Sequence, residues 1–148
     1  MSLKQWAENG WLKPHKTSPQ EIRNLLAIVE RDLKDASGDI SPDWRLGIAY
    51  NAALKLGMVL LAAEGYRPER TLQHYRTIQA IPLIMGETYR DDAQYLDACR
   101  TKRNTVEYDY VGAVTNDDSE ELIHFVGDFK ESVLDWLKTN HPDLIGNV

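Results

Sequence analysis

Residues Ser41–Gly65, SPDWRLGIAYNAALKLGMVLLAAEG, decide the fold of this chain. A serine followed by a proline is typical of a helix N-terminus, and Gly65 is a typical residue just past a helix end. Between these signals the apolar residues surround most of the helix instead of forming one stripe. They are Leu46, Ile48, Ala49, Ala52, Ala53, Leu56, Met58, Val59, Leu60, Leu61 and Ala62. A helix that is apolar on nearly every side is buried by others, so we expect it in the middle of a helical bundle.

Two amphipathic helices are predicted, one before this central segment in the chain and one near the C-terminus. Ser18–Glu21 reads as a capping box with proline at the first helical position, and the apolar stripe behind it continues to Ser37. Near the other end of the chain, the turn-forming residues Thr115–Asp118 precede a helix that ends before Pro142. That last helix has a strong apolar stripe of Leu122, Phe125, Val126, Phe129, Val133, Trp136 and Leu137.

Two further helices are predicted between the central helix and the last one. The first follows Pro68, and we expect Pro82 to kink it or end it and Gly86 to terminate it. The second covers Tyr89–Val111, where residues three and four apart again form a stripe.

The N-terminal residues form a separate short segment. Before Pro14, Leu3–Trp11 are expected to form an extra helix whose Trp6 and Trp11 cover one end of the bundle. No segment has a convincing strand pattern. The sequence therefore predicts one all-α domain over residues 1–148, an up-and-down bundle of four to five helices, with residues 1–17 as an N-terminal extension.

Composition restricts the cellular setting and the class of ligand. No uninterrupted apolar run reaches the ~18 residues that span a bilayer, and the N-terminus lacks the apolar core of a secretory signal. A single cysteine excludes a disulfide within the chain. We therefore expect a cytoplasmic protein without a membrane anchor. The net charge of −6 opposes general nucleic-acid affinity, but Arg67–Arg103 contains seven basic and five acidic residues.

The familiar catalytic and metal-binding motifs are missing. Glu121 and His124 have the Glu-x-x-His spacing of di-iron bundles, but the sequence lacks a second such pair, so we interpret them as a surface pair. Phosphate-binding glycine loops and the serine-hydrolase motif are also absent. No metal and no cofactor is predicted. Cys99 belongs to an apolar stripe and is expected to be a packing residue.

Two polar residues fall at apolar positions of predicted helices. His74 shares a helix face with Thr71, Ile78 and Ile81, so it is expected to face inward, either satisfied by a structural partner or serving the site. Asn51 lies among alanines and leucines, and we expect it to bond a neighbouring helix instead of a ligand.

Arg103 is the most unusual residue of the chain, because it interrupts the stripe of Leu96, Cys99, Val106 and Tyr110. Glu107, four residues later, is in position to hold the guanidinium in an ion pair. Together with Asn104, Tyr108 and Tyr110, Arg103 makes a polar, aromatic surface. Such a surface suits the recognition of the phosphate and the base of a nucleotide. It equally suits a hydrated interface between two helices of a dimer.

The segment Arg103–Tyr110, RNTVEYDY, resembles the signature of HEPN domains (higher eukaryote and prokaryote nucleotide-binding). In that superfamily an arginine is followed by a polar residue, often asparagine, then after four intervening residues by histidine, and in some members by a tyrosine two residues later. Arg103, Asn104 and Tyr110 match this pattern. The stretch Ile48–Gln79 is similar to the central region of these proteins. The resemblance implies an all-α bundle that dimerises through the face carrying the motif.

This sequence departs from the pattern at one position, because Tyr108 stands where the superfamily has histidine. In members that are metal-independent endoribonucleases, arginine and histidine act on the scissile phosphate. A tyrosine with a pKa near 10 is a poor base at neutral pH, so weak or absent cleavage is expected. His74 is the candidate for a replacement imidazole.

The resemblance also implies partners. Small bacterial members form toxin–antitoxin pairs with a minimal nucleotidyltransferase, and in some the tyrosine after the motif is nucleotidylated. Tyr110 is the corresponding candidate. We expect catalytic roles for Arg103, Tyr108 and His74, and ligand contacts from Arg103, Asn104, Tyr110 and Arg100. The alternative is a non-catalytic helical module for dimerisation or partner binding.

Overall fold

The computed structural model describes residues 1–108 and 113–146, except for the side chains of residues 105–108. It is 77% helical, which confirms the predicted all-α class. The elements in chain order are α1 (Leu3–Glu8), β1 (Leu12–Pro14), α2 (Pro19–Ala36), α3 (Pro42–Ala63), β2 (Tyr66–Pro68), α4 (Gln73–Met85), the 3-10 helix η1 (Glu87–Tyr89), α5 (Arg90–Tyr108), α6 (Asn116–Asn140) and α7 (Pro142–Ile145).

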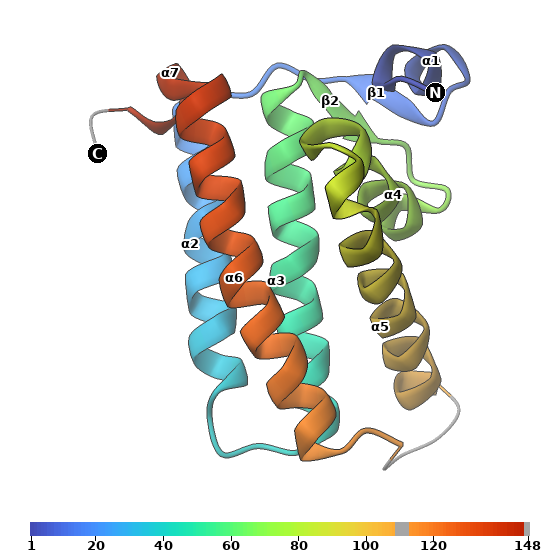
Figure 1. Ribbon diagram of the computed structural model, residues 1–148, viewed down its shortest axis with the longest axis vertical. Coiled ribbons are helices and arrows are strands. Elements are labelled where there is room, and N and C mark those ends of the chain that lie inside the picture. The colour runs from blue at the N-terminus through green and yellow to red at the C-terminus, as the bar shows by residue number, and fades with distance from the viewer. Residues whose placement is uncertain (109–112, 147–148) are drawn as a thin grey trace.

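The four longest helices, α2, α3, α5 and α6, run in alternating directions along the long axis of the molecule (Figure 1). Helix α3 is the central element, and it contacts α2 and α6 as well as α4 and α5. This arrangement confirms the helical bundle and the central place of residues 42–63. Most of α3 is buried, with residues such as Leu56, Val59 and Leu60 fully enclosed.

The central helix is also the most hydrophobic one. By length and composition α3 is able to cross a membrane, with a mean hydropathy of 1.6 over its most apolar stretch. In this structure two-thirds of that stretch is buried against the other helices. The mean hydropathy of this stretch stays high because only single polar residues, such as Asn51 and Lys55, interrupt the apolar residues.

The starts of α2 and α3 follow the predicted capping residues, whereas α6 starts at Asn116, inside the segment predicted as a turn. The Ser41 hydroxyl accepts a hydrogen bond from the Trp44 N–H, and Thr115 and Asp118 form a complete capping box at the start of α6. At α2 only half of the predicted box forms. Ser18 caps the helix, but the carboxylate of Glu21 instead accepts hydrogen bonds from the Thr17 hydroxyl and the His15 ring.

One expectation about local structure is confirmed in part, and one is wrong. Helix α4 passes through Pro82 and continues to Met85, so Pro82 does not end it. The helix ends at Gly86, as predicted, where φ is +113°. A small antiparallel sheet also forms, in which β1 pairs with β2 and Leu12 faces Pro68.

The N-terminal segment is held against α4. The predicted extra helix is present as α1, and Trp6 is buried against Leu12, Leu61 and Ala80. The guanidinium carbon of Arg76, on α4, lies 3.8 Å from the centre of the Trp11 ring. The cation–π contact ties residues 1–17 to α4, the helix that also carries His74. The β1–β2 pairing ties them to residues 66–68, which precede that helix.

Candidate functional site

Three helices bring predicted site residues together on one side of α3. The guanidinium carbon of Arg103, on α5, lies 5.7 Å from the centre of the Tyr50 ring, on α3. The centre of the His74 ring, on the first turn of α4, lies 6.0 Å from the same Tyr50 ring. We call Tyr50, His74, Arg100, Arg103 and Asn104 the α4–α5 site.

The imidazole of His74 is surrounded by positive charge. Burial lowers its pKa below the ordinary value of 6.5, and the nearby cations Arg103, Arg100 and Lys55 lower it further. Each of these effects disfavours the protonated ring. His74 is therefore neutral at pH 7 and able to accept a proton or a hydrogen bond. The expectation that it faces inward holds, since its side chain is partly buried.

The arginines of the site are oriented by neighbours on α5. Arg100 Nε donates to Asp97 Oδ1 over 2.8 Å, and the guanidinium lies 5.7 Å from the Tyr75 ring centre. Arg103 Nη1 donates to Asn104 Oδ1 over 3.4 Å. Arg103, Asn104 and Arg100 are all partly buried, so each guanidinium is partly shielded from solvent. A guanidinium in such a place interacts with an anion more strongly than one in open water.

Tyr50 is a site residue that the sequence did not reveal. Its side chain is 1% exposed, and within the described residues its hydroxyl has no hydrogen-bond partner. Burial raises the pKa of the phenol, so the hydroxyl stays protonated at neutral pH. A buried polar group without a partner is rare in proteins. Only the packing of α4 and α5 against α3 shows which charges surround it.

Two predicted site residues fall at the limit of the structure. Tyr108 is the last residue of α5, and its side chain is not described. Tyr110 lies outside the described residues. Their roles therefore stay predictions.

The remaining sequence candidates have structural explanations. Asn51 Nδ2 donates to Asp32 Oδ2 over 2.6 Å, which confirms the predicted bond to a neighbouring helix, α2. Glu121 and His124 are exposed on α6, as predicted for a surface pair. Across the described residues, no group of three or more His, Cys, Asp or Glu side chains could hold a metal ion.

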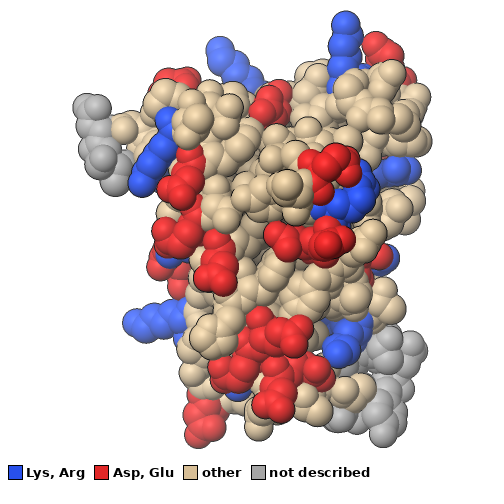
Figure 2. All heavy atoms as spheres, in the orientation of Figure 1, with Lys and Arg blue, Asp and Glu red and all other residues tan. Residues whose placement is uncertain are grey.

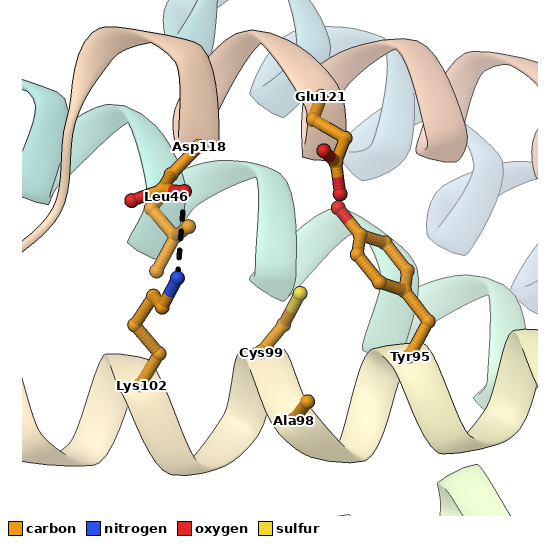
Figure 3. Close-up of a pocket in the computed structure, with 7 residues that line it drawn as sticks. All are labelled: Leu46, Tyr95, Ala98, Cys99, Lys102, Asp118 and Glu121. Atoms are coloured by element: carbon orange, nitrogen blue, oxygen red, sulfur yellow. Dashed lines mark ion pairs between the residues drawn. The ribbon is translucent and has the colours of Figure 1, made fainter.

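A small pocket lies on the other side of α5, between α5, α6 and the start of α3 (Figure 3). Its volume is about 70 Å³, well below the several hundred Å³ of most ligand pockets. The Lys102–Asp118 ion pair, at 3.4 Å, closes one end, and the Tyr95 hydroxyl points toward the Glu121 carboxylate at the other. Cys99 lies between them, 6% exposed, and burial raises its thiol pKa, as expected of a packing residue.

The surface charge is uneven. The face in front of α2 and α6 carries many acidic side chains and few basic ones (Figure 2). The arginines of the α4–α5 site belong to α5, in the part of the chain where basic residues outnumber acidic ones. A comparison with protein-family models, with curated proteins and with solved structures finds no match.

Proposed function

We propose that this chain is a HEPN-like protein that binds RNA or a nucleotide at the α4–α5 site. The observation that carries the proposal is the grouping of Arg103, the motif arginine, with Arg100 and His74 around Tyr50. Two guanidinium groups and an imidazole beside aromatic rings suit the recognition of a phosphate and an adjoining base. An acidic protein needs such a local basic cluster to attract a polyanion.

The proposed site is one for binding, with weak or absent cleavage. Tyr108 replaces the motif histidine, and a tyrosine transfers protons poorly near pH 7. His74 supplies an imidazole in the neutral form that a general base requires. We assign Arg103 to phosphate binding and charge stabilisation, Asn104 and Arg100 to ligand contacts, and His74 to proton transfer where cleavage occurs.

The resemblance extends the proposal to partners. We propose a cytoplasmic homodimer that pairs the motif faces of two copies, and a toxin–antitoxin type partnership with a minimal nucleotidyltransferase that modifies Tyr110. Support for these partners comes from the match of Arg103, Asn104 and Tyr110 to the motif.

The test of binding uses a fluorescently labelled single-stranded RNA and measures anisotropy. We expect the wild type to bind and Arg103→Ala to lose at least tenfold in affinity, because the substitution removes a charged phosphate ligand. Arg23→Ala is the matched control, since Arg23 is an exposed arginine on α2 away from the site. Equal affinity of Arg103→Ala and the wild type would remove Arg103 from the binding surface.

The test of cleavage incubates the same proteins, and Tyr108→His, with cellular RNA in the absence of metal. We expect little or no cleavage by the wild type and faster cleavage by Tyr108→His, which restores the motif imidazole. Arg103→Ala in the Tyr108→His background should abolish it. If no variant binds or cleaves RNA, the non-catalytic interaction module becomes the better account.

A further inference from the structure

The first turn of α4 has an unusual construction. Leu72, which precedes the helix, has a φ of +56°, a left-handed conformation that a leucine adopts only under constraint. Among the described residues, no side chain forms a capping hydrogen bond at the helix N-terminus. Leu72 is also 57% exposed, so packing of its side chain does not explain the conformation. Strained residues of this kind collect at functional sites.

The backbone N–H groups of Gln73, His74 and Tyr75 therefore lie at an uncapped helix start. A helix N-terminus carries a partial positive charge and favours anions. A helix start alone does not make a site, but here a second and independent feature lies beside it. The Tyr50 ring packs 6.0 Å from the His74 ring, and the Tyr50 hydroxyl is buried without a hydrogen-bond partner in the described part of the chain.

The surroundings of this hydroxyl indicate what kind of partner it lacks. The Arg103 guanidinium carbon lies 5.7 Å from the centre of the Tyr50 ring. The charges that act on the phenol include the positive ones of Arg100 and Arg103 and the negative one of Asp97, which accepts a hydrogen bond from Arg100. A neutral phenol donates a hydrogen bond to an anion, and it does so without adding charge. A phenylalanine would fill the same core position without a buried polar atom, so the hydroxyl is better explained by a ligand than by packing.

We propose that the first turn of α4 and the Tyr50 hydroxyl form an oxyanion site that holds one phosphate group of the ligand. Helix N–H groups contact the phosphate from one side, Arg100 from another, and Tyr50 donates a hydrogen bond from the core. The proposal rests on the proposed function for its nucleotide source, and it adds to that function a phosphate position and a residue, Tyr50, that the motif does not contain.

The test titrates inorganic phosphate into the wild type and into Tyr50→Phe, with binding followed by NMR chemical shifts. We expect Tyr50→Phe to bind phosphate about tenfold more weakly, because a hydrogen bond to a charged group is lost. We also expect its thermal unfolding temperature to stay equal or to rise, since an unsatisfied buried hydroxyl is removed. Tyr95→Phe, which alters a phenol in the pocket of Figure 3, should leave phosphate affinity unchanged.

Three results separate this inference from the proposed function. Phosphate affinity within twofold of the wild type in Tyr50→Phe, or no phosphate binding by the wild type, would overturn the oxyanion site. Phosphate binding that is weakened in Tyr50→Phe, without RNA binding by the wild type, would support the oxyanion site and refute the RNA-binding function. RNA binding that Tyr50→Phe leaves unchanged would support the function and refute the role of Tyr50.

Discussion

His74 shows how single residues acquire their properties from the fold. In the unfolded chain its imidazole titrates near the ordinary pKa of 6.5, whereas in the folded protein burial and the cations Arg103, Arg100 and Lys55 lower that pKa. Between the two pKa values the unfolded chain binds more protons than the folded one. The free energy of unfolding therefore decreases as the pH falls through 6.5 toward the lowered pKa of the folded state.

This sign leads to a prediction for His74→Gln. The wild type should lose stability between pH 7.5 and pH 5, and His74→Gln should lose less over the same range, because glutamine does not titrate. Urea unfolding followed by circular dichroism at several pH values measures both slopes. Comparing the two proteins cancels the contributions of all other titrating groups, which are the same in both. Identical slopes would show that the surroundings of His74 do not disfavour its charge.

At the same scale, sequence patterns identified Arg103, Asn104, Arg100 and His74 as candidates but could not identify Tyr50. Spacing along one helix shows which residues share a face, and Tyr50 falls among apolar residues of α3 like any core tyrosine. Its contact with His74 and Arg103 joins residues 24 and 53 positions apart in the chain. Such a contact depends on how three helices pack, which a helical period does not encode.

At the scale of elements, one glycine sets the distance between the central helix and the helix that carries His74. A Cβ atom added to Gly57, on α3, would lie 2.6 Å from Thr77 Cγ2, on α4. Thr77 is 2% exposed and its hydroxyl donates to the Gln73 carbonyl, so the side chain has little freedom to move. A larger residue at position 57 must push α4 outward.

We therefore expect Gly57→Ala to lower the free energy of unfolding by about 1–3 kcal/mol and to weaken RNA binding, because His74 moves with α4. Gly47→Ala is the matched control on the same helix, since its Cβ would meet no atom within 4 Å. That substitution should stabilise the protein by about 0.5–1 kcal/mol, as alanine is the better helix former. Chemical denaturation of both variants checks the pair. Equal effects of the two substitutions would contradict the close α3–α4 approach.

The element boundaries show where sequence reasoning works and where it fails. Serine caps predicted the starts of α2 and α3, because capping is a local interaction. At α6 the sequence indicated only a turn over Thr115–Asp118, and the helix starts within it, at Asn116. The strands β1 and β2 were missed, since each is three residues long and ends in proline. Their pairing depends on Leu12 and Pro68 meeting across the fold, and neither segment alternates long enough to predict a strand.

At the scale of the whole molecule, charged side chains are distributed unevenly between the sides of the bundle. The face in front of α2 and α6 carries more acidic than basic side chains (Figure 2). The arginines and the imidazole meet where α4 and α5 pack on α3. The contact of Arg76 with Trp11 holds the N-terminal segment against α4. This layout predicts that a nucleic acid contacts the α4–α5 side and is repelled by the acidic face.

Hydrogen–deuterium exchange with and without single-stranded RNA tests that layout most directly. We expect slower exchange in the bound state in peptides that cover the first turn of α4, residues 73–76, and residues 98–104 of α5. We expect little change in α2 and α6. Arg103→Ala should lose this protection. Protection confined to α2 and α6, or spread evenly over the chain, would contradict an RNA-binding site between α4 and α5.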